Sequence, residues 1–168
     1  MKLQPYEQGS LDSLCGVYAL INASRIAYPQ GRSPFWETLF NESIDWLCRS
    51  GAKYIYEGLS SKELMSLCKA VFRPRIKGLK LKRPLLRVGL LSEPELAVQL
   101  EAMLGEPGAG VIVGIDNYDW GHWSVLRRMT PYHYTLFDSD GLKRLRRGRG
   151  SVLARHVFVL KVASGRVF

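Results

Sequence analysis

The sequence has only three cysteines in 168 residues, Cys15, Cys48 and Cys68. Their number is odd, their spacings are wide and no C-x-x-C pair is present, which argues against a disulfide framework or a zinc knuckle and fits a reducing compartment. Histidines are equally few, and none has ligand spacing with a cysteine, so neither a metal nor another cofactor is expected. Cys48 and Cys68 fall among apolar residues of predicted helices, and we expect both in the core.

Long hydrophobic runs are also missing. No stretch reaches the roughly 18 apolar residues that a membrane-spanning helix needs. The first eight residues, Met-Lys-Leu-Gln-Pro-Tyr-Glu-Gln, lack the apolar segment of a secretory signal peptide, so we expect a cytoplasmic location. A hydrophobic content of 46% is typical of a globular protein. The length predicts a single domain, residues 1–168, with a substantial core.

Acidic residues are absent from two long segments. Residues 64–92 carry eight bases and no acid, residues 141–168 carry eight more, and the intervening residues 93–140 hold eight acids and two bases. Such blocks attract acidic proteins, nucleic acid or anionic lipid, but the solvated faces of a basic protein have the same composition. We expect an acidic partner for segments 64–92 and 141–155 and do not infer a nucleic-acid role.

The periodicity of apolar residues predicts helices first and strands second. Two capping boxes, Ser60–Glu63 and Ser92–Glu95, mark helix starts. The predicted helices cover residues 13–28, 34–49, 61–72 and 92–105. One or two short strands are expected within 75–91, and further strands at 111–115, 122–126, 132–137 and 156–162. This order indicates an α+β fold, with a helical part at about 1–105 and a sheet part at about 110–163.

The connections between the strands predict their pairing. The runs at 111–115, 122–126 and 132–137 are joined by short segments, so we expect an antiparallel meander. The Arg-rich residues 143–150 are expected to form an exposed loop between the last two strands.

Cys15 stands where a loop enters a hydrophobic helix. The first N–H groups of a helix have no internal partner and the helix dipole is positive there, so a thiolate is stabilised. Upstream, Gln8 could donate its amide N–H to an oxyanion, together with the backbone N–H of Cys15. Packing in the core remains the alternative for an isolated cysteine.

His122 is the histidine with a candidate partner. It opens a predicted strand, and the neighbouring predicted strand ends in Asp138, which would lie close to His122 if the two strands are antiparallel neighbours. A carboxylate there fixes the imidazole tautomer and stabilises its protonated form. Asp140 is the second candidate for this role, and shaping the turn before Gly141 is the alternative for both aspartates. His133 and His156 have no such partner in the sequence, and we interpret both as structural.

The order of these motifs resembles that of the papain-like cysteine peptidases. The shared features are Gln8, the helix opened by Cys15-Gly16 after Asp12, Gly-His-Trp-Ser-Val at 121–125 and Leu-Phe-Asp-Ser-Asp-Gly at 136–141. The sequence is most similar to compact bacterial enzymes related to bacteriocin-processing, double-glycine peptidases. The Josephin deubiquitinases have a similar layout. The gap from Gln8 to Cys15 is longer than in these families, which keeps Gln4 as an alternative donor, and Ser139 stands where proline commonly follows the aspartate.

The resemblance implies a papain-like fold, with the catalytic cysteine at the start of a central buried helix packed on a C-terminal antiparallel sheet. It implies Cys15 as nucleophile, His122 as general base, Asp138 as its orienting acid and Gln8 as oxyanion donor. The expected reaction is hydrolysis of a peptide or isopeptide bond in a protein or peptide substrate through a thioester.

Three residues around His122 are candidates for substrate binding. Trp120, Gly121 and Trp123 flank the histidine and could wall the cleft, although ordinary packing of the tryptophans explains them equally well. Two other functions stay open. The same triad could transfer the acyl group to an amine, as in a transglutaminase or acyltransferase. Alternatively, the protein is a non-catalytic adaptor that binds an acidic protein or nucleic acid through its basic segments.

Overall fold

The computed structural model describes residues 3–9, 12–51, 53–117, 120–147 and 152–163, with Asn117 and Trp120 described by their backbone alone. Its helices are α1 (Cys15–Ala27), α2 (Ser33–Gly51), α3 (Tyr54–Glu57), α4 (Ser61–Leu67), the π-helical turn η1 (Cys68–Phe72), α5 (Arg73–Arg75) and α6 (Glu93–Leu104). Its strands are β1 (Leu79–Lys82), β2 (Ala109–Asn117), β3 (Trp120–Met129), β4 (His133–Leu136), β5 (Arg144–Arg146) and β6 (Val152–Val162). None of the described helices is long and apolar enough to cross a membrane.

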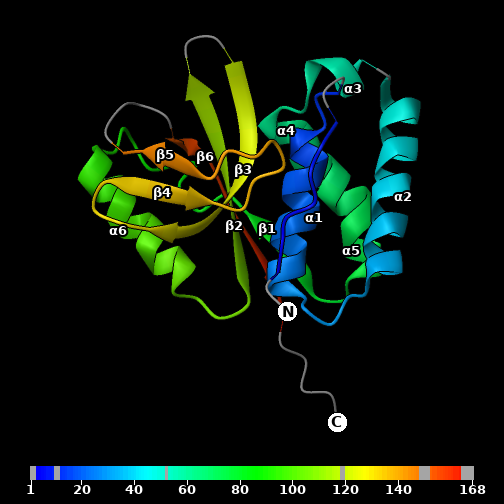
Figure 1. The fold of residues 1–168 in the computed structure, drawn as a ribbon, viewed down its shortest axis with the longest axis horizontal. Helices are drawn as coiled ribbons and strands as arrows, with labels where there is room; N and C mark the ends of the chain where they lie inside the picture. Colours follow the sequence, from blue (N-terminus) through cyan, green and yellow to red (C-terminus); the bar gives the residue numbers. More distant parts are fainter. Residues whose placement is uncertain (1–2, 10–11, 52, 118–119, 148–151, 164–168) are drawn as a thin grey trace.

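The six strands form one antiparallel sheet in the order β1-β6-β2-β3-β4-β5 (Figure 1). The predicted meander is confirmed, because β2 pairs with β3 and β3 with β4. The last strand, β6, returns across the sheet to lie between β1 and β2. The α+β class is therefore confirmed, with the N-terminal helices packed on an antiparallel sheet.

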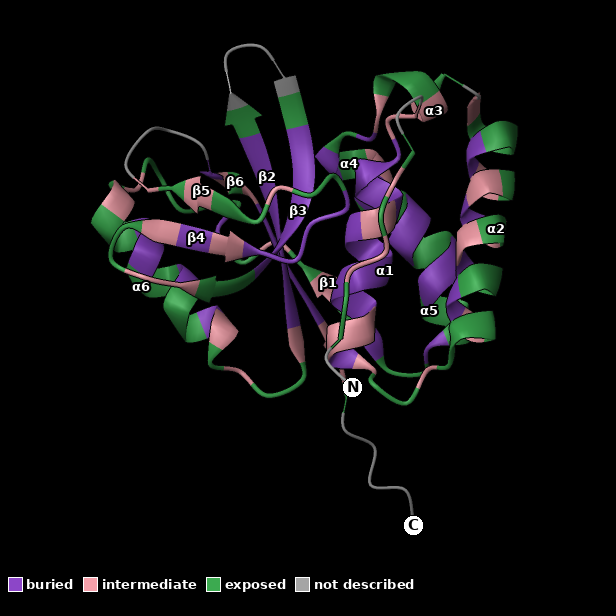
Figure 2. Cartoon of the chain, viewed as in Figure 1, coloured by how far each residue is buried: buried purple, intermediate pink, exposed green. Residues whose placement is uncertain are grey.

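Helix α1 lies at the centre of the molecule. It contacts β2, β3 and β6 on one side and α2 and α4 on the other. Its apolar residues are buried nearly all round, with Val17, Leu20 and Ala23 at 0% exposure. Figure 2 shows buried residues along α1 and the central strands, while the outer side of α2 is exposed. The prediction of a buried helix that begins at or next to Cys15 is confirmed.

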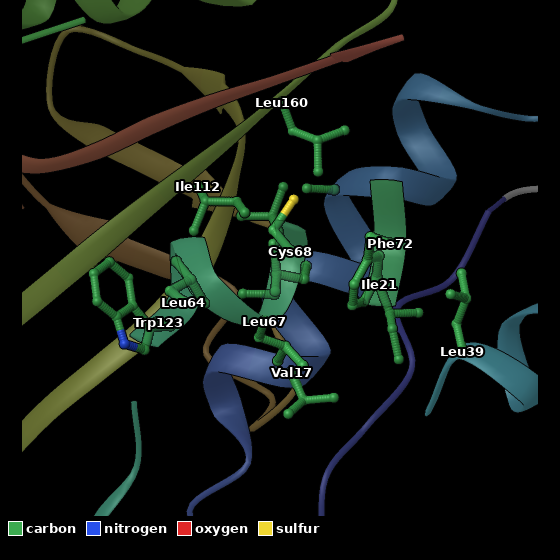
Figure 3. Close-up of a cluster of buried hydrophobic side chains, with 14 of the residues drawn as sticks. Val17, Ile21, Leu39, Leu64, Leu67, Cys68, Phe72, Ile112, Trp123 and Leu160 are labelled. Carbon is green, nitrogen blue, oxygen red and sulfur yellow. The ribbon is translucent and has the colours of Figure 1, made fainter. Parts of the chain in front are cut away.

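The core lies on both faces of the sheet, as alternation along a strand requires. On the α1 side, side chains from α1, α2, α4 and η1 pack against Ile112, Trp123 and Leu160 of the sheet (Figure 3). On the other side, Val111, Val113 and other alternate strand residues pack against α6.

Glycine at position 110 allows α1 to approach the sheet closely. A Cβ atom at Gly110 would lie 2.5 Å from the backbone oxygen of Ala23 in α1. Backbone atoms cannot move away as the end of a flexible side chain can. The close packing of α1 against β2, and with it the position of Cys15, therefore depends on the absence of a side chain at Gly110.

The predicted short strands and the predicted Arg-rich loop differ in detail from the structure. Of the one or two strands expected within residues 75–91, one forms, β1, while residues 85–88 form a turn in which Leu86, Arg87 and Val88 are exposed and Leu85 is buried. The Arg-rich segment is not a simple loop, since Arg144–Arg146 forms edge strand β5, paired with β4. Its central Leu145 packs against the core on the α6 side, which gives this short run the alternation of a strand. The end of the predicted loop, residues 148–150, lies outside the described residues.

The prediction that Cys48 lies in the core is wrong. Cys48 is exposed, whereas Cys68 is buried at 1% exposure, as expected. Helix α2 buries only one stripe, Trp36, Leu39, Ser43 and Leu47, and Cys48 follows that stripe on the solvent side. Burial raises the pKa of the Cys68 thiol to about 12, against a smaller lowering by Arg73.

Replacement of Gly110 by alanine tests the contact between helix and sheet. We expect Gly110→Ala to lower the free energy of unfolding by about 1–3 kcal/mol, because the added methyl group forces α1 and β2 apart. Denaturation in urea measures the change. Gly89→Ala is the matched control, since a Cβ at Gly89 meets nothing within 4 Å. Equal stability of the two variants would show that α1 is not held at this contact.

Candidate active site

The site begins at the loop before α1. The Asp12 carboxylate accepts hydrogen bonds from the backbone N–H of Leu14 at 3.1 Å and of Gly9 at 3.2 Å. Cys15 is the first residue of the helix and is 7% exposed. The first helical hydrogen bond runs from Tyr18 N–H to the Leu14 carbonyl, so the N–H of Cys15 has no acceptor within the helix. A negative charge at this position is favoured by the helix dipole.

The short helix α3 is hydrogen-bonded to the residues that precede α1. The backbone N–H of Ser13 donates to the Ile55 carbonyl at 2.8 Å, and the Ser13 hydroxyl donates to the Tyr56 carbonyl at 2.8 Å. These bonds join the residue two positions before Cys15 to a segment about forty residues later in the chain. Helix α3 has no counterpart among the helices predicted from the sequence.

His122 and Asp138 form a buried ion pair between β3 and the end of β4. The His122 Nε2 atom donates to Asp138 Oδ2 at 2.6 Å, and the side chains are 5% and 2% exposed. The two residues come together because β3 and β4 are antiparallel neighbours. This is the juxtaposition that the sequence predicted.

The second ring nitrogen of His122 is left for Cys15. The Cys15 side chain lies beside the His122 ring and contributes to its raised pKa. Since Nε2 is held by Asp138, Nδ1 is the ring nitrogen that remains for the sulfur. Cys15, His122 and Asp138 therefore lie in the order thiol, imidazole, carboxylate.

The charges of this series support one another. Burial lowers the pKa of His122, but the hydrogen bonds to Asp138 and Cys15 and their negative charge outweigh burial and raise the pKa to about 10. Burial raises the pKa of Asp138, but the hydrogen bonds and charge of His122, with a contribution from Ser124, hold it below its ordinary value. The site thus favours a protonated imidazole beside an ionised carboxylate.

The Asp138 carboxylate also shapes the turn that follows it. Its second oxygen, Oδ1, accepts from the backbone N–H of Asp140 at 2.8 Å and of Leu142 at 3.1 Å. Asp138 therefore accepts a hydrogen bond from His122 and shapes the turn at the same time, through different oxygen atoms. Asp140 is exposed, and the contact with His122 belongs to Asp138.

The structure separates the two candidate glutamines. Gln8 lies beside the residue after Asp138: its backbone N–H donates to the Ser139 carbonyl at 2.9 Å, and the Ser139 hydroxyl donates to Gln8 Oε1 at 3.4 Å. The Gln4 carbonyl accepts instead from Arg25, near the far end of α1 from Cys15. Gln8 is therefore the glutamine that is joined to the site. Ser139, which is buried, holds it there.

A cleft of about 620 Å³ opens at Cys15 and His122. Two of the three candidates for substrate binding, Gly121 and Trp123, line it. The Trp123 indole is mostly buried, and its Nε1–H donates to the Leu59 carbonyl at 2.6 Å, so this side chain both packs in the core and walls the cleft. The side chain of the third candidate, Trp120, lies outside the described residues.

His156 is a cleft residue that the sequence interpretation treated as structural. Its ring meets the Trp123 ring edge-on at 5.7 Å. Arg155 Nε donates to its Nε2 at 3.0 Å, so Nδ1 carries the proton and donates to the Ser61 hydroxyl at 2.9 Å. Burial and the charges of Arg155 and Arg83 lower the pKa of His156, against an opposite effect of Asp116. No local signal could reveal this, because β6 and α4 meet only in the folded chain.

Glycine at position 114 allows this wall to form. A Cβ atom there would lie 2.6 Å from the Cβ of His156 and 3.0 Å from the Trp123 ring. No cluster of three or more potential metal-binding His, Cys, Asp or Glu side chains occurs among the described residues. The cleft places a cysteine sulfur beside an imidazole that favours its protonated form, next to open space, and this arrangement suits attack on an acyl carbon.

The pairing predicts how stability depends on pH. The folded-state pKa of His122 lies above the ordinary 6.5, so its contribution is complete below pH 6.5 and is lost as the pH rises through about 10. In Asp138→Asn we expect the pKa of His122 to fall. The free energy of unfolding should then decrease less as the pH rises than it does in the wild type. NMR of the His122 C2–H resonance and denaturation at several pH values measure the two effects. Asp140→Asn, which removes an exposed carboxylate, is the control. An unchanged His122 titration in Asp138→Asn would contradict the pairing.

Comparison of the chain with protein-family models, with curated proteins and with solved structures found no match. The function therefore has to be inferred from the side chains of the cleft and their contacts.

Proposed function

We propose that this protein is a papain-like cysteine peptidase that hydrolyses a peptide or isopeptide bond. The observation that carries the proposal is that Cys15, at the start of a central buried helix, shares a cleft with the buried His122–Asp138 pair. Burial of an ion pair costs free energy, because both charges lose their hydration. Buried titratable groups with strongly shifted pKa values in a cleft are typical of functional sites rather than of an ordinary core. The papain-like resemblance of the sequence supports the same conclusion.

The first step is formation of a thioester. The Cys15 thiolate attacks the substrate carbonyl carbon, and the electron pair of the C=O bond moves to oxygen. The resulting oxyanion accepts hydrogen bonds from the Cys15 backbone N–H and from the Gln8 carboxamide. His122 then gives its Nδ1 proton to the leaving nitrogen as the C–N bond breaks. An amine departs, and a thioester on Cys15 and a neutral His122 remain.

The second step restores the protein. His122 Nδ1 takes a proton from a water molecule, whose oxygen attacks the thioester carbon. The C–S bond breaks, the acid product leaves, and the thiolate and the imidazolium are regenerated. Asp138 stays ionised throughout and keeps the ring oriented through Nε2. An amine in place of water at this step would give acyl transfer, which uses the same residues.

Alkylation by iodoacetamide tests the proposal. We expect Cys15 to react below neutral pH faster than the exposed Cys48, which serves as the internal reference, while the buried Cys68 stays unreacted. In His122→Ala the rate at Cys15 below neutral pH should fall about 10–100-fold, because the thiolate loses its cation. Mass spectrometry of the three cysteine peptides measures the rates.

His133→Ala is the matched control, since His133 lies on β4 and is not among the residues that line the cleft. The proposal is wrong if Cys15 follows the pH profile of Cys48, or if its rate does not depend on residue 122.

A further inference from the structure

Three cationic side chains line the cleft that opens at Cys15: Lys62 of α4, Arg83 after β1 and Arg155 of β6. The hydrolytic steps use none of them. Within the described part of the chain, the ion pairs that form involve other bases, and none of these three is paired with an acid within 4.0 Å. Of the acids that line the cleft, Glu57 lies 3.9 Å from Lys53, and Asp116 forms no ion pair within 4.0 Å among the described residues.

Arg83 is held in a fixed position within this group. Its Nη2 donates to the Arg155 backbone carbonyl, and its guanidinium lies 5.2 Å from the centre of the Phe158 ring. Its Nε is buried and has no hydrogen-bond acceptor among the described residues. A buried donor without an acceptor costs free energy, and more when it carries charge. The side chain is therefore held in one position at the wall of the cleft.

These cations line the same cleft as Cys15. Arg155 and Arg83 both act on the neighbouring His156, whose ring stays neutral with Nδ1 protonated. The His156 ring contacts Trp123, and Trp123 follows His122 in the chain. The cations and the Cys15–His122 pair thus lie along one continuous cleft.

We propose that Lys62, Arg83 and Arg155 form a subsite for a carboxylate of the substrate. The protein then acts on a peptide that carries an acidic side chain, or its free C-terminal carboxylate, near the bond that is broken. This inference rests on the proposed function. A planar guanidinium with fixed N–H donors matches the geometry of a carboxylate. Peptides also fit the cleft better than nucleic acid does, because it contains a nucleophile suited to acyl carbon and apolar side chains such as Leu59 and Trp123.

Two alkylating reagents that differ in charge test the subsite. Iodoacetate carries a carboxylate and iodoacetamide is its neutral counterpart, so the ratio of their rates at Cys15 reports recognition of the carboxylate. We expect this ratio to be higher at Cys15 than at Cys48 and to fall about five- to tenfold in Arg83→Gln. Arg128→Gln, which removes an exposed arginine of β3 outside the cleft, is the matched control and should leave the ratio unchanged.

Protection of Cys15 by peptides distinguishes the two sources of the carboxylate. The probes are a blocked tripeptide with a central glutamate, the same peptide with glutamine, and the glutamine peptide with a free C-terminus. Stronger protection by the first supports an acidic side chain, and stronger protection by the third supports a C-terminal carboxylate. Equal protection by all three, with the same reagent ratio in Arg83→Gln and the wild type, would overturn the subsite. Protection by a short oligonucleotide alone would overturn it in favour of nucleic acid.

A measurement that does not use Cys15 separates this inference from the proposed function. A bound carboxylate should offset the charges of Arg83 and Arg155 and raise the pKa of His156, which NMR of its C2–H resonance reports during titration with the glutamate tripeptide. We expect the effect in the wild type and its loss in Arg83→Gln. If Cys15 is unreactive but this shift occurs, the peptidase proposal fails and the carboxylate subsite stands. If Cys15 is reactive and the glutamate tripeptide leaves the pKa of His156 unchanged, the carboxylate subsite fails and the peptidase proposal stands.

Discussion

The arrangement of the site depends on one buried ion pair, His122 with Asp138. Removal of charges from water costs several kcal/mol for each ion unless hydrogen bonds compensate for it. Here the compensation is extensive: Asp138 Oδ2 accepts from His122, Oδ1 accepts from two backbone N–H groups, and the other side of the imidazole meets Cys15. Loss of either partner leaves an uncompensated charge in the interior. The pair therefore constrains β3, the end of β4 and the turn after it.

Cys15 is brought to the His122–Asp138 pair by the packing of α1 rather than by an attraction between charges. Cys15 is placed by α1, whose backbone touches β2 at Gly110 and whose first residues are held by α3 and Asp12. Interiors are close-packed, so a helix fixed at such a contact has little freedom to slide. A site on rigid elements keeps its reacting atoms in place. Arg83 and His156 line the open part of the cleft.

Local sequence patterns predicted the elements that carry the site, but not everything that surrounds it. Capping boxes and periodicity placed the helices, and short connections between strands placed His122 next to Asp138. The exposure of Cys48 was not predictable in this way, because neighbouring apolar residues do not show which side of a helix is buried. The contributions of Arg83, Arg155 and His156 depend on β6 lying between β1 and β2, a pairing across about eighty residues that has no local signature. The assignment of Gln8 over Gln4 also needed the contact with Ser139.

A nucleophilic Cys15 carries an acyl group during the proposed reaction. Intact-protein mass spectrometry during reaction with p-nitrophenyl acetate measures this directly, with the modified residue located by peptide mapping. We predict a transient acetyl group on Cys15 that water removes, and that persists in His122→Ala once formed, because the base that activates water is missing. Acetylation of Cys48 with none on Cys15 would show that Cys15 is not the nucleophile, and an acetyl group on Cys15 that is lost at the same rate with and without His122 would show that His122 does not activate water.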